Sequence, residues 1–410
     1  NVTFLVFGQF SSLIGNYTLK FACSMYVLEQ TGSAGVFAAL LAVAMIPTVL
    51  LSPFGGMLAD RLNRRNIMVA LDVLSGLSVL AAILLSCGSF SIPLLGVLLI
   101  ILSVLGAFES PTVQACVPQM LSGDNIIKGN AVINQIQAVA SLITPFAGSV
   151  FYVAFGITPV MAASAACFFL TALLECFIRL ERPKISKRQS ALQIIKGDLG
   201  DSMHFLRKEQ PGVLKLLFLT ALVSLFAMGV VTVGFPFLVR TVLGLSAEHY
   251  GAAESMMGIA AILGGIAVSL FANRWKLNKL YWLMVMMGAC LFPAGAAFLL
   301  PVSPFVKYLV LVAAFFIGQA LCSIFSVCAL TAIQGRTPQQ LTGKIMSYVM
   351  TISLCAQPLG QFVYGILFDA FQESVWWVLV PTGAVILSIG WLSSGFFSRL
   401  QEETIKPENT

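Results

Sequence analysis

Charged residues are scarce in this chain of 410 residues. Asp, Glu, Lys and Arg make up 10% of it, whereas a soluble globular protein carries about 25% charged residues to cover its surface. This scarcity argues against a soluble enzyme and against a disordered chain. Histidine is rarer still: His204 and His249 lie far apart in the sequence, so no metal cluster is expected from them.

Several motifs that carry chemistry are also missing. The nine cysteines contain no C-x-x-C pair, so neither a zinc site nor a disulfide framework is indicated. No G-x-x-x-x-G-K-[ST] loop is present, so ATP is not expected to drive the protein directly. No H-E-x-x-H or comparable set points to a membrane-embedded enzyme. We therefore expect a protein that is not an enzyme and has no cofactor.

Apolar residues dominate what is present, at 58% of the chain. A membrane-spanning helix needs about 20 mostly apolar residues, and a barrel strand about ten alternating ones. The sequence therefore predicts an all-α membrane protein with twelve transmembrane helices in two six-helix halves. The predicted spans lie near 2–28, 34–58, 66–88, 92–116, 128–154, 159–180, 213–240, 249–272, 280–300, 305–333, 343–370 and 375–398.

The basic residues predict the orientation. Nearly all of the 23 Lys and Arg residues fall in inner segments if the N-terminus is cytoplasmic, so the positive-inside rule places both termini in the cytoplasm. We expect an N-terminal bundle over 1–180, a linker over 181–212, a C-terminal bundle over 213–398 and a tail over 399–410. Apolar residues recur at helical spacing in the linker, which fits an amphipathic helix on the membrane or a short helix packed under the bundle.

The two halves show weak internal similarity. Asp60-Arg61 follows the second span, Asn273-Arg274 follows the eighth at a fixed offset, and Pro145 and Pro358 are separated by the same offset. Duplicated halves are typical of secondary transporters that work by alternating access. They disfavour a simple channel.

One loop carries a family signature. Gly56-Met57-Leu58-Ala59-Asp60-Arg61-Leu62-Asn63-Arg64-Arg65 resembles the G-x-x-x-D-R-x-G-R-R/K motif of the major facilitator superfamily. The matching residues are Gly56, Asp60, Arg61, Arg64 and Arg65. Asn63 replaces the usual Gly, and we expect it to keep a left-handed turn there. The resemblance implies that Asp60 latches onto the start of the eleventh span; a basic loop that only sets topology is the simpler alternative.

Further stretches narrow the resemblance. Phe108-Glu109-Ser110-Pro111 and Gly129-Asn130-Ala131 resemble the macrolide-efflux and siderophore-exporter branch of that superfamily, and a related drug/proton antiporter motif survives in part as Pro145 and Gly148. An ordinary helix bend would also explain this last pair. The resemblance implies a multidrug-resistance exporter in the inner membrane of a bacterial cell.

Ionisable residues inside the spans are candidate functional residues, because charge is expensive in a membrane. Glu109 could bind and release a proton or attract a cationic substrate, although simple pairing with a loop residue is an alternative. Lys20 and Glu254 could pair with each other, or Lys20 could reach outward to water. We expect structural roles for Asp72 and Glu175, because the resemblance puts their spans at the periphery.

Uncharged candidates complete the predicted cavity. By resemblance, spans 1, 4, 7 and 10 line it. The uncharged polar candidates are Asn16, Gln114, Thr220, Ser224, Gln319 and Ser323, and Phe226 is an aromatic candidate. A cavity with few charges suits a lipophilic solute.

The leading prediction is a secondary active transporter that couples protons to the export of lipophilic small molecules such as macrolide-like drugs. The alternative substrate is an amphipathic lipid (lysophospholipid-like) or a siderophore. Expected partners are the substrate, protons and membrane lipids, with the chain acting as a monomer. Nucleic acid is not expected despite the net charge of +6, because no aromatic residues interleave the basic stretches.

Overall fold

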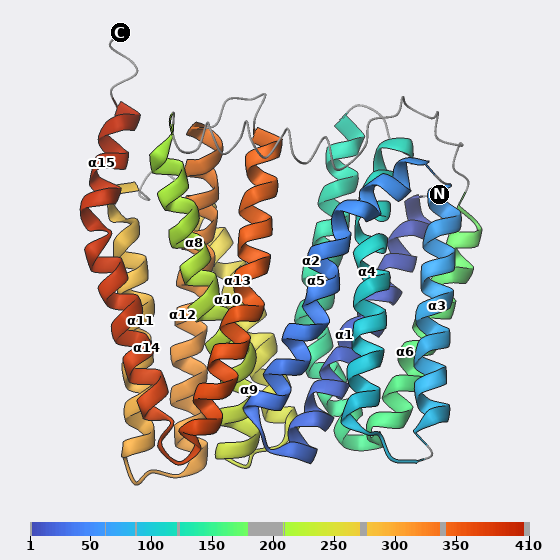
Figure 1. Cartoon of the computed structure of the whole chain (residues 1–410), viewed down its shortest axis with the longest axis horizontal. Coiled ribbons are helices and arrows are strands. Elements are labelled where there is room, and N and C mark those ends of the chain that lie inside the picture. Colours follow the sequence, from blue (N-terminus) through green and yellow to red (C-terminus); the bar gives the residue numbers. More distant parts are fainter. Residues whose placement is uncertain are drawn as a thin grey trace. The chain divides into compact units, whose positions relative to one another are not determined.

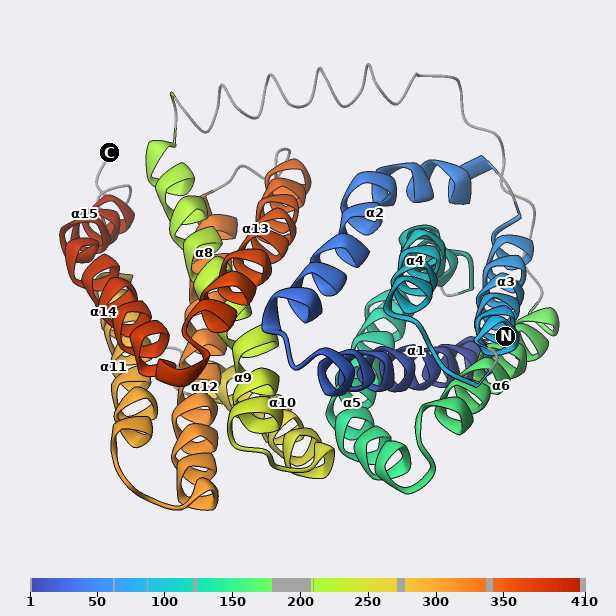
Figure 2. The same cartoon turned by 60° about the horizontal axis from the view of Figure 1, so that its bottom comes forward.

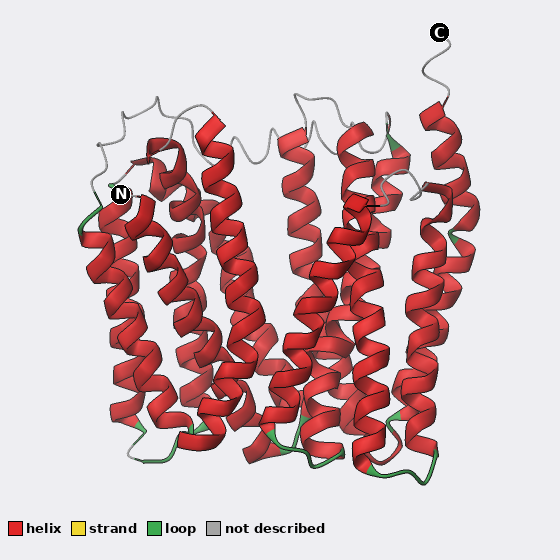
Figure 3. Ribbon diagram, turned by 180° about the vertical axis from the view of Figure 1, so that it is seen from behind, coloured by secondary structure: helices red, strands yellow, loops and turns green. Residues whose placement is uncertain are grey.

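The computed structural model describes most of the chain, with gaps. The described residues are 2–61, 63–86, 88–120, 124–178, 208, 210–270, 277–336 and 342–405. The predicted linker 181–212 therefore lies almost entirely outside them, and so do the side chains of Gly56, Asp60, Arg61 and Gln114. The described part consists of helices joined by short loops, with no strand (Figure 3).

Six long helices form the first half of the chain. Their bounds follow the predicted spans, and several run past the predicted ends. They are α1 (Val2–Thr31), α2 (Ala34–Arg61), α3 (Arg64–Leu85), α4 (Ile92–Met120), α5 (Asp124–Phe155) and α6 (Ile157–Cys176).

The second half begins with α8 (Pro211–Gly229), which continues through the π-helical turns Val230–Gly234 and Leu238–Val242 on either side of α9 (Phe235–Phe237). The run predicted to end at residue 398 instead divides: α14 ends, and α15 continues the helix to Ile405. The helices after α9 are α10 (Ala247–Leu270), α11 (Leu280–Leu299), α12 (Pro304–Arg336), α13 (Thr342–Ala370), α14 (Trp376–Leu392) and α15 (Ser394–Ile405).

Nine segments of the described residues are long and apolar enough to cross a membrane. The other three predicted spans correspond to α1, α2 and α13. Many side chains of α2 and α13 lie outside the described set. Helix α1 carries Gln9, Asn16 and Lys20, which lower its mean hydropathy. These three polar residues therefore explain why α1 is not counted among the segments that are apolar enough to cross a membrane.

The chain divides into two compact units. Unit 1 comprises Asn1–Gly32, Leu40–Arg188 and Ser246–Ser255, and unit 2 comprises Ser33–Ala39, Gln189–Leu245 and Met256–Thr410. In unit 1, α1 lies against α5 and α6, and α3 packs between α4 and α6 (Figure 2). In unit 2, α11 runs beside α14 and α12, and α8 beside α13 (Figure 1).

Glycine allows close helix contacts in both units. In unit 1, Gly15 faces α6, where an added Cβ would lie 2.9 Å from Cβ of Cys167. In unit 2, an added Cβ on Gly288 of α11 would lie 2.5 Å from the carbonyl oxygen of Gly383 on α14. Backbones that approach this closely are typical of membrane helix pairs, which associate through small residues rather than through a hydrophobic effect.

Candidate functional site

Polar side chains from four helices meet inside unit 1. The Ser12 hydroxyl of α1 lies 3.1 Å from Oδ1 of Asp72 on α3 and 3.3 Å from Oε1 of Glu109 on α4. Glu175 of α6 lies close enough to Asp72 for their carboxyl groups to interact. Gln9 of α1 lies beside Glu109 and Glu175. We call these five residues the acidic cluster.

The acidic cluster is largely shielded from solvent. Asp72 and Glu175 are fully buried, Ser12 and Gln9 are buried, and Glu109 is half-buried. Among the described residues, Oδ2 of Asp72, both carboxyl oxygens of Glu175 and Nε2 of Gln9 have no hydrogen-bond partner. Buried polar groups without hydrogen-bond partners lower the free energy of unfolding. The acidic cluster would therefore destabilise the protein if its role were purely structural.

The sequence of α1 explains how the acidic cluster forms. Gln9 and Ser12 are three residues apart and therefore lie on one face of the helix. Gly8 beside them has no side chain, and an added Cβ there would lie 3.7 Å from Cγ of Glu175. The Thr171 hydroxyl of α6 also donates to the carbonyl oxygen of Gly8, at 3.0 Å. These contacts hold α6 close to α1 and bring Glu175 toward the other carboxyl groups.

Lys20 is the basic residue whose charge acts on Glu109. Its side chain is exposed. The predicted alternative, an ion pair between Lys20 and Glu254, is not present in the described part of the chain. Glu254 instead interacts with Tyr250, one turn earlier on α10, and the Tyr250 ring stacks on Phe21 with a centroid distance of 5.6 Å.

The charges of the acidic cluster must be balanced. Three carboxylates with one nearby lysine would leave net negative charge away from water, which is costly. The described residues contain no group of three or more His, Cys, Asp or Glu side chains arranged to hold a metal ion. Ionisation of all three carboxyl groups at the same time is therefore unfavourable.

Other predicted residues of the first half lie in varied surroundings. Oδ1 of Asn16 is buried without a described partner. Pro145 lies inside α5, where it removes one helical hydrogen bond. An added Cβ on Gly148 would lie 3.5 Å from Cγ2 of Thr18 on α1, so this stretch of α5 packs closely on α1. Gln114 has no described side chain.

The end of the family-signature loop differs from expectation in one respect. Asn63 has a φ of −68° and a ψ of 110°, which is extended rather than left-handed backbone. Its side chain accepts a hydrogen bond from the backbone N–H of Arg65 at 3.1 Å, so Asn63 caps the start of α3. The prediction of a left-handed turn at Asn63 was wrong, and Asn63 instead acts as the N-terminal cap of α3. The side chains of Asp60 and of the first residues of α13, its expected latch partner, lie outside the described set.

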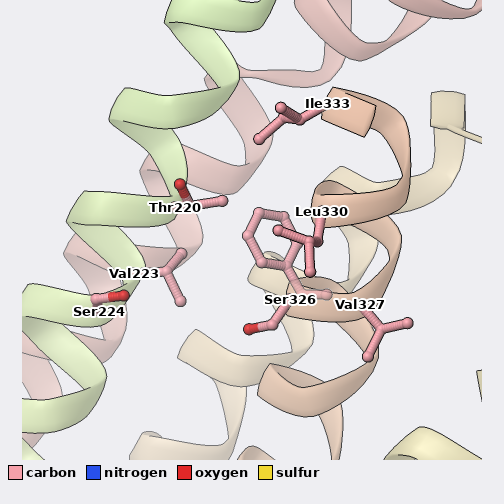
Figure 4. Close-up of a pocket in the computed structure, with 8 residues that line it drawn as sticks. Thr220, Val223, Ser224, Ser326, Val327, Leu330 and Ile333 are labelled. Atoms are coloured by element: carbon pink, nitrogen blue, oxygen red, sulfur yellow. The ribbon is translucent and has the colours of Figure 1, made fainter. Parts of the chain in front are cut away.

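Unit 2 contains two largely apolar pockets. The larger has a volume of about 210 Å³ and is bordered by α8 and α12, with Thr220, Ser224 and Ser326 as its polar residues (Figure 4). The smaller, of about 50 Å³, is lined by Phe226 and Gln319, among mainly apolar side chains such as Met287. Four uncharged candidates chosen from the sequence thus lie on these two pockets.

Sequence analysis did not single out Asp369. Within unit 2 its carboxylate accepts hydrogen bonds from the Ser33 hydroxyl at 2.6 Å and from the N–H groups of Ala34 and Gly35 at 2.6 and 2.9 Å. These N–H groups belong to the first turn of α2, where a negative charge is favourable. Nothing in the sequence linked Asp369 to a residue more than 300 positions away.

The chain matches known proteins along most of its length. A family model described as Major Facilitator Superfamily matches residues 5–361. A curated protein named Macrolide efflux protein A, from Streptococcus pyogenes, is 23% identical over 386 residues, which are 93% of each chain. The Multidrug efflux pump Tap of Mycolicibacterium fortuitum is 24% identical, covering 89% of this chain and 88% of its own.

Solved structures share the fold at low sequence identity. A bacterial homologue of the iron transporter ferroportin in an inward-facing state has a TM-score of 0.71 and 16% identity, covering 98% of both chains. A D-xylose-proton symporter has a TM-score of 0.69 and 15% identity, covering 95% of this chain and 97% of its own. The predicted twelve-helix fold and the predicted resemblance to the efflux branch are confirmed.

Proposed function

The chain belongs to the Major Facilitator Superfamily, and from this premise we propose that it exports lipophilic small molecules, such as macrolide-like drugs, in exchange for protons. That it is a multi-pass membrane transporter rather than an enzyme follows from the family. Proton coupling and the substrate class are the proposal. The observation that carries the coupling is the acidic cluster, in which Glu109 shares the Ser12 hydroxyl with Asp72.

Glu109 is the central group of this proposal. It is half-buried in a membrane-spanning helix, it interacts with a neighbouring hydroxyl, and it lies within electrostatic reach of Lys20. A carboxyl group in such a setting binds a proton in one state of the cycle and releases it in another. Lys20 is the positive charge near Glu109 once the proton has left.

The pockets of unit 2 support a lipophilic substrate. Their linings are mainly apolar, with a few hydroxyl groups and one amide, which is typical of sites that bind drug-like molecules. Neither pocket is large enough to enclose a macrolide, since pockets for drug-sized ligands measure about 300–1,000 Å³. Each would therefore hold one part of such a molecule. The names of the efflux relatives support the direction of transport.

We also propose the predicted topology, with both termini in the cytoplasm, a cytoplasmic linker over 181–212 and the signature loop on the inner face. In this arrangement Asp60 stabilises the closed state of the cytoplasmic side. Asp60→Asn should reduce transport while leaving membrane insertion unchanged. Full activity of this variant would contradict the latch.

Drug accumulation tests the proposed function. The full chain is expressed in an efflux-deficient bacterium, and accumulation of a panel of macrolides and lipophilic dyes is measured with and without a protonophore. Lower accumulation that the protonophore reverses is expected. Glu109→Gln should abolish it, whereas Glu373→Gln, which alters an exposed carboxylate, should behave like the wild type.

Two outcomes would contradict the proposal. Unchanged accumulation of every compound, with the protein present in the membrane, would favour an amphipathic lipid or a siderophore as the substrate. Export that persists in Glu109→Gln at the wild-type rate would show that the coupling group lies elsewhere.

A further inference from the structure

We propose that Asp72 and Glu175 form a second proton-binding site, which the Ser12 hydroxyl connects to Glu109. The coupling proton would pass from Glu109 through Ser12 to this carboxyl pair. This inference rests on the proposed function and deepens it, because it names the route of the proton. It gives Asp72 and Glu175 a role beyond the structural one expected from their peripheral helices.

The geometry of Ser12 carries the first step. Its single O–H lies between two carboxyl oxygens, at 3.1 Å from Asp72 and 3.3 Å from Glu109. A hydroxyl donates one proton at a time, so two ionised carboxylates cannot both be satisfied by it. When one carboxyl group is protonated, Ser12 accepts from that group and donates to the other. Ser12 therefore hydrogen-bonds to both carboxyl groups only when one of them carries a proton.

The transfer step balances without a further reactant. The O–H bond of Ser12 breaks as its proton moves to Oδ1 of Asp72, and a new O–H bond forms as Oγ takes the proton from Oε1 of Glu109. Ser12 ends neutral, Glu109 ends ionised and Asp72 ends protonated. One proton has moved from α4 to α3.

Glu175 and Gln9 supply the second observation. Asp72 and Glu175 lie within electrostatic reach of each other, and Oδ2 of Asp72 and both carboxyl oxygens of Glu175 have no hydrogen-bond partner among the described residues. A shared proton would let one carboxyl group donate to the other. Gln9 is 7% exposed, and its unpartnered Nε2 lies beside Glu109 and Glu175. This amide can donate to whichever of the two is ionised.

Few other ionisable groups act on this route among the residues that the structure describes. Helix α1 contributes Lys20, which acts on Glu109, and α3 begins with Arg64, whose charge acts together with that of Glu175 on Cys116 of α4. On α6, Cys167 lies beside Ser11. The positive charges thus stand at the two ends of the route: Lys20 acts at the Glu109 end, and Arg64 stands where α3 begins.

The route leads toward one end of unit 1. Glu175 lies in the last turn of α6, which ends at Cys176, and α3 begins at Arg64. Asp72 lies eight residues into α3, about 12 Å along the helix. A proton that reaches Glu175 is therefore near the end of the helix bundle. With the proposed topology, this end faces the cytoplasm.

Infrared titration tests proton binding without any substrate. Purified full-length protein is titrated with acid while the C=O stretch of protonated carboxyl groups is recorded. Asp72→Asn and Glu175→Gln should each remove or shift a titrating band that Glu109→Gln leaves in place. Titrating bands that are unchanged in both Asp72→Asn and Glu175→Gln would overturn the second site. Because Asn and Gln match the size of Asp and Glu, folded protein is expected; a variant that does not fold is replaced by Asp72→Glu, which should shift the same band.

Transport in proteoliposomes tests the bridge. The probe is the compound of the accumulation panel that cells exclude most strongly. Ser12→Ala should slow transport driven by a pH gradient by about tenfold or more, while exchange of the probe without a gradient stays unchanged. Ser12→Thr keeps the hydroxyl and should restore coupling. The matched control is Ser11→Ala, because Ser11 donates to the carbonyl oxygen of Cys167 at 3.1 Å rather than to a carboxyl group.

The failures of the two proposals are distinguishable. If Glu109→Gln retains gradient-driven transport, or if no compound is exported, the proposed function fails; the infrared titration still decides whether Asp72 and Glu175 bind a proton. If Glu109→Gln abolishes coupling while Ser12→Ala and Asp72→Asn transport like the wild type, the proposed function stands and the relay is wrong.

Discussion

The two units of the molecule bury very different side chains. In unit 1, α1, α3, α4 and α6 bring three carboxyl groups together around Ser12. In unit 2, a large apolar cluster fills the space between α8, α11, α12 and α14, with members such as Leu217, Met284 and Phe325. Elsewhere in unit 2, the buried hydroxyl groups of Tyr364 and Thr382 are hydrogen-bonded to each other at 2.9 Å.

This difference distinguishes the buried groups that stabilise helix packing from those that we assign to transport. Unit 2 demonstrates that this chain can build a helix bundle from apolar side chains, glycine contacts and uncharged polar groups. Buried carboxyl groups are a less stable solution to the same packing problem. We infer that unit 1 retains them for proton movement, and that unit 2 contributes an apolar surface to the substrate.

The largest effect on stability is expected where the backbones of two neighbouring helices, α11 and α14, are in contact. Gly288→Ala should destabilise unit 2 by about 2–3 kcal/mol, because its Cβ would lie 2.5 Å from the carbonyl oxygen of Gly383 and the helices would have to separate. The measurement is the thermal unfolding temperature in detergent. Gly8→Ala is the matched change in unit 1: its Cβ would lie 3.4 Å from Cγ2 of Thr171, an ordinary contact, so the temperature should barely move. Equal losses in both variants would contradict the packing contrast.

The next effect concerns substrate choice. Phe226→Ala enlarges the smaller pocket of unit 2 and should change the ratio of transport rates for two drugs of different size by about three- to tenfold. The proton requirement should stay intact, since the acidic cluster is in unit 1. Phe218→Ala is the control, because Phe218 lies on the same helix but is 65% exposed. A loss of coupling without a change in drug preference would reverse the roles assigned to the units.

A smaller effect is expected for the hydroxyl pair of unit 2. Tyr364→Phe removes the hydrogen bond to Thr382 and should cost about 1 kcal/mol of stability, with transport unchanged. Unfolding temperature and transport rate are measured on the same preparation. The comparison is with Ser12→Ala in unit 1, which should slow transport and leave the stability unchanged. If both variants lose only stability, the hydroxyl of Ser12 is structural.

The smallest effect concerns the cap at the start of α2. Asp369→Ala removes an acceptor from the N–H groups of Ala34 and Gly35, and because Asp369 is exposed we expect a loss of about 0.5–1 kcal/mol. Hydrogen exchange of these two amides should accelerate accordingly. Glu373→Ala, an exposed change nearby in sequence, should leave their exchange unchanged.

The sequence predicted correctly the properties that depend only on the order of residues along the chain. The helical spans follow from run length and hydropathy, and the family follows from the spacing of Gly56, Asp60 and Arg64. Glu109 stood out because a carboxylate inside an apolar run is visible without knowing its neighbours. Asp72 and Glu175 were equally visible but were assigned structural roles, because their helices were expected at the periphery.

The sequence by itself determined that this protein is a helical membrane transporter, because the length and apolarity of the runs leave few other ways to satisfy the backbone in a membrane. Only the tertiary structure decided which polar groups meet. The Ser12 hydroxyl, the carboxyl groups around it and the Asp369 cap join residues from 60 to more than 300 positions apart. Such contacts depend on which helix faces pack together, and small residues such as Gly15 set how closely they do so.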